Sequence, residues 1–242
     1  MPTTTAVRTT QETPAATFTH GVRDGNTYTL RRYTTLPSLL HVLHNEQITL
    51  LSPASWDDRN DVFFMNQYGD RKGAKSVLAL CFSMALETYH HWRVFTHGSE
   101  GVCIEFERQT LLARLNKEEG LRASDVEYKR IEALEAERPL VDALPFLKRL
   151  PYEDEQEFRL VYLSRSEVVE AKSFHIDLKS IRRITLSPWM PRALVTPVIT
   201  TIRSIAGCPR MKVSQTRLLE NERWKRTALQ EAKPEGRRNA NP

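Results

Sequence analysis

Two glutamates and an arginine at alternate positions, Glu155, Glu157 and Arg159, form the pattern in this sequence that is best suited to chemistry. In an extended backbone, side chains two residues apart point to the same side, so we expect the three to share one face. Two ionised carboxylates held close together are costly unless a cation compensates them, and Arg159 can supply that cation. The same pattern is also typical of a surface salt-bridge ladder, which does no chemistry.

Arg32 and Ser83 are two further polar residues at positions suited to ligand binding, because each lies on a predicted strand. Arg32 belongs to the first strand, and Ser83 ends the apolar segment Ser-Val-Leu-Ala-Leu-Cys-Phe-Ser. An arginine guanidinium suits phosphate groups because it presents its N–H donors in a planar fork. Trp56 and Trp92 can each stack on a ring of a ligand, and both are equally compatible with a place in the core.

The elements that must position these residues mix strands and helices without regular β-α-β alternation. Apolar and β-branched segments predict strands over residues 28–33, 48–51, 76–83, 102–106, 157–163, 181–186 and 211–214. Apolar periodicity and capping residues predict helices from Thr34 or Thr35 onward and over residues 88–96, 111–117, 193–205 and 217–232. A further helical pattern covers residues 131–147 and is broken by Pro139 and Pro145. The polar segment 52–61 is predicted to be a loop of the kind that often carries a binding site. This mixture predicts an α+β fold, a single domain with a mixed, mostly antiparallel sheet flanked by helices.

The charge distribution divides the chain into three parts. Residues 1–26 are rich in Thr, Ala and Pro and lack periodicity, which predicts a disordered tail before a folded domain over residues 27–216. From Arg203 to the end there are ten Lys or Arg against four Asp or Glu, a net charge of +6 in a chain whose total is +5. The basic helix and tail over residues 217–242 could therefore bind a protein or nucleic-acid partner, or form a solvated helix face.

The cysteine and histidine pattern predicts neither disulfides nor a metal site. Three cysteines far apart, without a C-x-x-C pair, indicate reduced thiols and a cytoplasmic location. His90, His91 and His97 cluster, but adjacent histidines on a helix point apart, and no Asp or Cys stands at ligand spacing. No apolar run approaches the ~20 residues needed to span a bilayer, and the N-terminal segment lacks the apolar core of a secretory signal, so we expect no membrane partner.

Four segments of the chain carry a family resemblance: RRYTTLPSLLHVLHNEQITLLSPASWDDRND, ALCFSMALETYHHW, GVCIEFE and YEDEQEFRLVY. In order and spacing they resemble the bacterial family known as domain of unknown function 2971, from about Leu30 to about Leu218. One difference is that residues 60–64 are Asn-Asp-Val-Phe-Phe, where the family usually has Asn-Asp-Pro-Phe-Glu. The role of that final acid therefore does not carry over to this chain.

A second, looser resemblance concerns activity. The order of Arg32 on the first strand, Ser83 on a middle strand and Glu-x-Glu before a late strand is similar to the Arg-Ser-Glu class of ADP-ribosyltransferases. This resemblance implies a split sheet and NAD as the substrate, with no metal. It implies that Arg32 holds the ribose or phosphates and that Ser83 orients the nicotinamide half, although Ser83 here follows Cys-Phe rather than standing in Ser-Thr-Ser.

The same resemblance implies roles for the acidic pair. Glu157 would stabilise the positive charge that develops on the ribose when the nicotinamide bond breaks, because a fixed carboxylate there favours the transition state. Glu155 would activate the acceptor, while Arg159, Trp56 and Trp92 would complete the NAD site. The sequence leaves open which of the acids at positions 153, 155 and 157 is essential, and which acceptor is used.

Three functions follow from these observations. The first is an NAD-consuming ADP-ribosyltransferase-like enzyme, of a kind suited to a toxin or phage-defence effector. The second is a non-catalytic module that binds a nucleotide or a phage component in the same cleft. The third is a nucleic-acid-binding protein that uses the basic C-terminal segment. Paired acids in a cleft repel phosphate, which favours the first function over the third.

Overall fold

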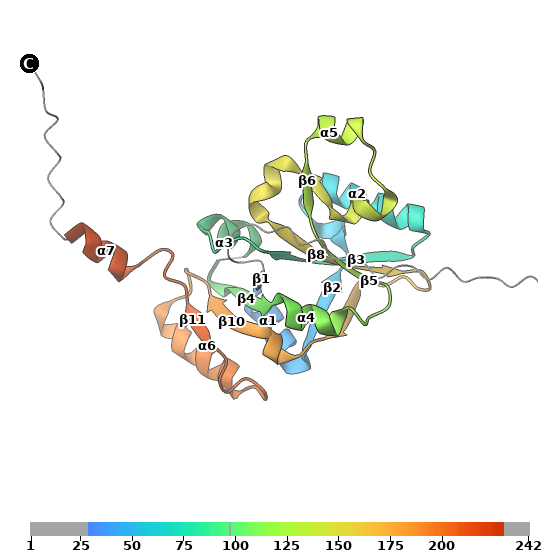
Figure 1. Ribbon diagram of the computed structural model, residues 1–242. Coiled ribbons are helices and arrows are strands. Elements are labelled where there is room, and N and C mark those ends of the chain that lie inside the picture. Colours follow the sequence, from blue (N-terminus) through green and yellow to red (C-terminus); the bar gives the residue numbers. More distant parts are fainter. Residues whose placement is uncertain (1–28, 97, 230–242) are drawn as a thin grey trace, which may run out of the picture.

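A nine-stranded sheet forms the centre of the computed structural model, which describes residues 29–96 and 98–229 (Figure 1). Its strands are β1 (Thr29–Thr35), β2 (Gln47–Leu51), β3 (Ser76–Ser83), β4 (Gly101–Glu107), β5 (Leu121–Asp125), β8 (Glu157–Ser164), β9 (Ala171–His175), β10 (Ile181–Leu186) and β11 (Val213–Gln215). A separate pair, β6 (Glu127–Lys129) and β7 (Leu147–Arg149), lies outside this sheet. Within the nine-stranded sheet only β10 and β11 pair in parallel among the described residues, so the predicted α+β fold with a mostly antiparallel sheet is confirmed.

The sheet is split at the junction between β1 and β3. β1 pairs with β4 along its whole length, from Thr29↔Glu107 to Thr35↔Gly101. β3 pairs with β8 along its whole length, yet β1 and β3 meet only at Arg31↔Ser83. The halves β11-β10-β4-β1 and β5-β8-β3-β2-β9 are therefore joined at one residue pair and separate beyond it.

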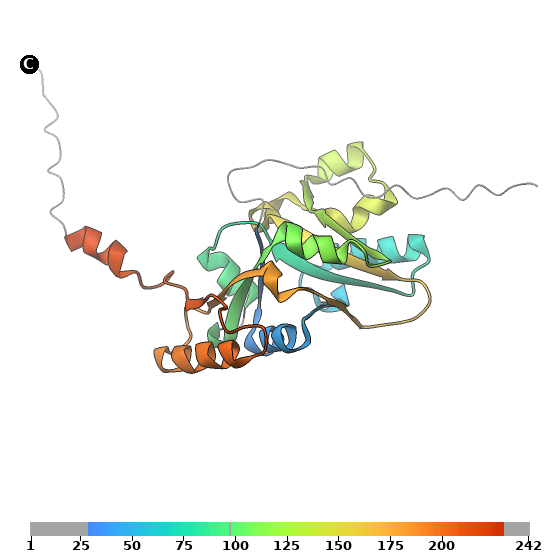
Figure 2. The ribbon, with the colours of Figure 1, turned by 60° about the horizontal axis from the view of Figure 1, so that its bottom comes forward.

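The described residues contain seven α-helices, of which the first six lie around the two halves (Figures 1 and 2). They are α1 (Leu36–Asn45), α2 (Arg59–Lys72), α3 (Tyr89–Phe95), α4 (Arg108–Leu115), α5 (Ile131–Ala136), α6 (Arg192–Ser204) and α7 (Glu222–Leu229). Figure 2 shows α1 and α6 along one side of the sheet. The predicted start of α1 is confirmed: Thr35 is its N-cap and accepts a hydrogen bond from the backbone N–H of Ser38.

The two faces of β8 serve different purposes because its side chains alternate. Phe158 and Leu160 enter the main core, where the Phe158 ring lies 6.3 Å from that of Phe82. Arg159 and Val161 point to the other side, where α2 and the 3₁₀ helix η3 (Val141–Phe146) pack over the sheet. The chain therefore buries a charged side chain beneath a helix while an unbroken apolar core forms on the opposite face.

The structure corrects several predicted elements. The helical pattern over residues 131–147, predicted to be broken at Pro139 and Pro145, forms an α-helix only in α5, which ends at Ala136. The 3₁₀ helix η3 and strand β7 follow it, because the prolines interrupt α-helical hydrogen bonding. Helix α2 and strands β5 and β9 were not predicted, since their apolar patterns are short or weak. The predicted basic helix is shorter at its start, with α7 beginning at Glu222. The predicted disordered tail, His97 and residues beyond 229 lie outside the described residues.

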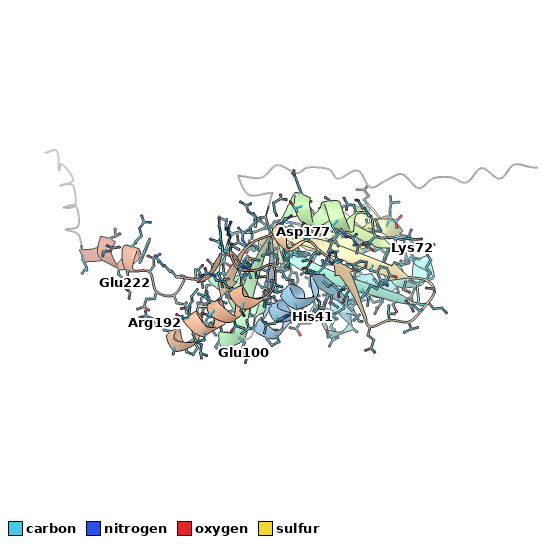
Figure 3. All side chains as sticks on the ribbon, turned by 90° about the horizontal axis from the view of Figure 1, so that it is seen from below. His41, Lys72, Glu100, Asp177, Arg192 and Glu222 are labelled. Atoms are coloured by element: carbon cyan, nitrogen blue, oxygen red, sulfur yellow. The ribbon has the colours of Figure 1, made fainter. Side chains whose placement is uncertain are left out.

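Helix α7 extends away from the sheet, and Figure 3 labels Glu222 on it and Arg192 on α6 beside the connecting segment. An ion pair between Arg192 and Glu220 links that segment to α6. No helix within residues 29–96 and 98–229 is long and apolar enough to cross a membrane.

We predict that Phe158→Ala lowers the free energy of unfolding by about 3–5 kcal/mol, because Phe158 is fully buried and its removal leaves a cavity in the main core. The matched control is Phe63→Ala on α2, where the side chain is 59% exposed, and we expect a change within about 0.5 kcal/mol. Urea unfolding followed by circular dichroism measures both. Equal losses in the two variants would contradict the packing described here.

Candidate functional site

A cavity of about 480 Å³ lies where β1 and β3 separate. Residues 31–33 of β1 and residues 81–83 of β3 line it from the two halves of the sheet. The segment before α2 contributes Trp56, and the last turn of α3 contributes Val94 and Phe95. The volume falls within the range of about 300–1,000 Å³ that is typical of small-molecule sites. The split of the sheet therefore produces a cavity large enough for a small molecule.

Arg159 is the structural support of one wall of this cavity. Its side chain is fully buried, and each of its five N–H groups has an acceptor. Nε and Nη2 donate to the two carboxylate oxygens of Glu157 at 2.6 and 2.8 Å. Nη1 and Nη2 donate to the two oxygens of Asp61 on α2, and Nη1 also donates to the carbonyl oxygen of Pro145. All hydrogen-bond donors of Arg159 are therefore used within the protein, and Arg159 does not line the cavity. It positions the acids, whereas the sequence predicted that it contacts a ligand.

Lys148 on β7 connects the acids that do line the cavity. Its Nζ donates to Glu155 Oε2 at 2.5 Å and to Glu157 Oε2 at 3.2 Å. It also lies 3.9 Å from Asp61 Oδ2 and 4.8 Å from the centre of the Tyr152 ring. We define Asp61, Lys148, Glu155, Glu157 and Arg159 as the acidic cluster. With three carboxylates and two cations, it carries one uncompensated negative charge.

The environment gives the two glutamates different proton affinities. Burial opposes ionisation of Glu157, but the charge and hydrogen bonds of Arg159, together with Lys148, outweigh burial and lower its pKa to about 2. Burial raises the pKa of Glu155, and the ammonium group of Lys148 only partly offsets that effect. Burial likewise raises the pKa of Asp61 despite its contact with Arg159. Glu157 is therefore a fixed anion, whereas Glu155 is the acid better placed to exchange a proton.

The two glutamates do not approach each other in the way that the sequence predicted. Gln156 between them has a left-handed backbone with φ 43° and ψ 58°, so residues 155–157 are not extended. Glu155 ends the 3₁₀ helix η4 (Leu150–Glu155), whereas Glu157 begins β8. Their carboxylates meet because both bind Lys148.

The opposite wall of the cavity is basic. Arg32 is partly buried, and Nη1 donates to the carbonyl oxygen of Cys81 at 3.1 Å across the gap between the two halves. Burial lowers the pKa of the Arg32 guanidinium, while the charge of Glu157 opposes that change. Arg31 also lines the cavity, and its Nη1 donates to the carbonyl oxygen of Ala85 at 2.8 Å. The cavity thus has a basic wall on β1 and an acidic wall formed by β8 and the segments that pack over it.

Of the remaining predicted site residues, Ser83 and Trp56 line the cavity and Trp92 does not. Ser83 Oγ donates to the carbonyl oxygen of Glu155 at 2.8 Å, so it fixes the backbone beside the acid. The Trp56 ring centre lies 5.1 Å from Arg159 Cζ. Trp92 is fully buried, packs edge-on against Tyr33 and donates from Nε1 to Glu87, so it is a core residue.

Three cavity-lining residues contain buried polar atoms that lack a hydrogen-bond partner within the described part of the chain. They are Arg31 Nε, Tyr33 Oη and Asp58 Oδ2. Buried polar atoms without partners are uncommon, because leaving one unsatisfied costs about 1–3 kcal/mol. Their concentration around one cavity is typical of a site prepared for a polar ligand.

Sequence reasoning missed Lys148 and Asp61. Asp61 belongs to the polar segment predicted to carry a site, so its neighbourhood was indicated although the residue was not. Lys148 follows an apolar segment at no informative spacing from the acids, and only the fold brings it to them. The described residues contain no group of three His, Cys, Asp or Glu side chains arranged to hold a metal ion. No protein-family model matches the chain, and no curated protein matches it by sequence.

We predict that Arg159→Met destabilises the fold by about 3–5 kcal/mol, because Glu157 and Asp61 would remain buried with only Lys148 to compensate their charges. Arg183→Met is the matched control, since Arg183 pairs with Glu105 at a position where its side chain is 51% exposed, and we expect a loss below about 1 kcal/mol. Urea unfolding measures both. Small and similar losses would show that the buried pair is no stronger than the surface pair.

We predict an acid-side loss of stability that depends on Glu157. Because its pKa falls from 4.5 to about 2 on folding, its contribution is complete above pH 4.5 and is lost as the pH falls towards 2. Asp61 and Glu155 have raised pKa values, so their contributions change in the opposite sense and increase stability on acidification. Unfolding free energies measured from pH 7 to pH 2 should show a smaller loss in Glu157→Gln than in wild type and in Glu153→Gln, whose side chain is exposed. Glu107 and Asp142 also have lowered pKa values and account for part of the remaining loss. If the loss of stability at acid pH were the same in Glu157→Gln as in wild type, titratable groups other than Glu157 would cause it.

Proposed function

We propose that the cavity binds NAD and that the protein transfers the ADP-ribosyl group from NAD to an acceptor. The observation that carries this proposal is the opposition of a basic wall and an acidic wall within one cavity. NAD contains an anionic pyrophosphate and a cationic nicotinamide ring, so its charge distribution complements both walls. Since NAD is an abundant cytoplasmic metabolite, the proposal also places the protein in the cytoplasm.

The basic wall suits the pyrophosphate. Arg32 makes one hydrogen bond to the protein in the described residues, to Cys81, and therefore has N–H donors available for phosphate oxygens. Arg31 lines the same cavity, and its Nε has no hydrogen-bond partner in the described residues, although it lies 3.7 Å from Glu105 Oε1. Trp56 and Phe95 add aromatic surface for a ring of the ligand.

The acidic wall suits the bond that breaks. Heterolysis of the bond between ribose C1′ and the nicotinamide nitrogen leaves the electron pair on neutral nicotinamide and a positive charge on the ribose. Glu157 remains ionised and is held rigidly by Arg159 and Lys148, so its charge requires no reorganisation to face that cation. The acceptor then attacks C1′ and gives up a proton, and Glu155, whose pKa is raised, is suited to take it.

A second candidate is a non-catalytic nucleotide-binding module. It is favoured because both carboxylate oxygens of Glu157 already accept hydrogen bonds from the protein. One of its oxygens accepts from Arg159 Nε, and the other accepts from Arg159 Nη2 and Lys148 Nζ. Only limited acceptor capacity therefore remains for a ribose hydroxyl. Such a module would bind NAD or another nucleotide through the basic wall and leave it intact.

We predict that Glu157→Gln lowers the rate of nicotinamide release at least ~100-fold, because the amide keeps the shape but lacks the charge that faces the ribosyl cation. Glu155→Gln should spare the release of nicotinamide to water and depress transfer to the acceptor. Glu153→Gln is the control, since that side chain is exposed and does not line the cavity. Nicotinamide release and transfer of labelled ADP-ribose measure the two steps, and thermal melts check folding.

The outcomes separate the two candidates. If wild-type protein binds NAD without releasing nicotinamide, the binding module replaces the transferase. If NAD does not bind, both candidates fail for this nucleotide. Equal and modest effects of Glu155→Gln and Glu157→Gln on turnover would remove the distinct roles given to the two acids.

A further inference from the structure

A second hollow, of about 540 Å³, is lined by Glu46 at the end of α1, by the residues that precede and begin β10, and by the segment between α6 and β11. It shares no lining residue with the cavity above. Four of its lining residues are cations, Lys179, Arg182, Arg210 and Lys212, and we define these as the basic groove. Their sequence positions fall in two groups about thirty residues apart. The fold therefore gathers them, and their proximity is not a consequence of a local run of charge.

The parallel pairing of β10 and β11 creates the groove. Because parallel strands start at the same end, the residues that precede and begin β10 lie beside those that precede β11, with Ile184 opposite Val213. The backbone N–H of Ile184 also donates to the carbonyl oxygen of Lys212 at 2.8 Å, which fixes the two segments together. At Gly207 the backbone has φ 82°, and an added Cβ would lie 3.1 Å from Leu178 Cδ1, so the two segments pack closely at this point.

The four cations of the groove form no ion pair within the residues that the structure describes. Arg182 is held in place by donating from Nη1 to Thr29 Oγ1 at 3.2 Å. Two acids also line the hollow, but Asp177 accepts from the backbone N–H of Lys179, and Glu46 lies 3.9 Å from His175 Nε2. Asp177 is labelled in Figure 3. Counting its lining residues alone, the hollow has a net charge of +2, which attracts an anion.

We propose that the basic groove binds the phosphate groups of an anionic ligand. Arginine and lysine converging from two segments match a ligand with several phosphates, because each cation can contact a different oxygen or phosphate. Two sources share this chemistry: a free polyphosphate compound and the backbone of a nucleic-acid strand. The groove also accounts for part of the basic C-terminal charge, since Arg210 and Lys212 lie here rather than on α7.

The test uses the full-length protein with two probes, inorganic tripolyphosphate and a fluorescent single-stranded oligonucleotide. Tripolyphosphate binding is followed by calorimetry and oligonucleotide binding by anisotropy over a range of salt concentrations. The test variant is Arg210→Gln/Lys212→Gln. The matched control is Arg223→Gln/Arg226→Gln on α7, which removes the same charge from the same basic stretch. All four side chains are exposed, so both variants should fold, and circular dichroism checks this.

We expect the groove variant to lose at least ~10-fold in affinity for one or both probes, whereas the α7 variant retains wild-type affinity. If the oligonucleotide is the ligand, the magnitude of the slope of log affinity against log salt should decrease by about 1.4, which is ~0.7 for each of the two lost contacts with a single strand. If the groove variant loses affinity for tripolyphosphate alone, the ligand is a free polyphosphate compound. If it loses affinity for the oligonucleotide alone, the ligand is a nucleic-acid strand. Wild-type protein that binds neither probe, a groove variant that binds like wild type, or an equal loss in the α7 variant would overturn the proposal. None of these readouts depends on NAD.

Discussion

The saturated guanidinium of Arg159 is the constraint on which the candidate site depends. A fully buried cation would be prohibitively costly without acceptors, so the fold supplies two carboxylates and a carbonyl oxygen from three elements. In doing so it fixes the position of α2 through Asp61, of η3 through Pro145 and of the first residue of β8 through Glu157. The site's acidic wall is thus a direct consequence of accommodating one buried arginine.

The split sheet provides the other half of the geometry. An unbroken ladder between β1 and β3 would bring their side chains together and leave no space for a ligand. Because the strands share only the pair Arg31↔Ser83, Arg32 stands on one side of a gap and the acidic cluster on the other. Charges of opposite sign are therefore kept apart by a cavity instead of neutralising each other, and this separation makes the site suited to a ligand that carries both charges.

The fold class could be predicted from the sequence because strands such as β3 and β8 are apolar, and because Thr35 gives a recognisable helix start. The common face of Glu157 and Arg159 also followed from strand periodicity, since both lie on β8. Lys148 could not be predicted, because its contact with the acids depends on how β7 packs. Gln156 in a left-handed conformation could not be predicted either, since glutamine rarely adopts it. Local pattern therefore gave the strands, while long-range packing decided which charges meet.

The segment between β5 and β8 has an architectural consequence. These strands are hydrogen-bonded neighbours, and the backbone N–H of Val126 donates to the carbonyl oxygen of Glu157, so the chain that leaves the sheet after β5 returns beside its point of departure. This closed excursion carries Lys148, Tyr152 and Glu155. Changes in its length or composition can therefore alter the cation, the ring and the proton-accepting acid while the strand ladders stay intact. The molecule thus builds this wall of the cavity from a segment that is separate from the nine-stranded sheet, so the wall can be altered without changing how those strands pair.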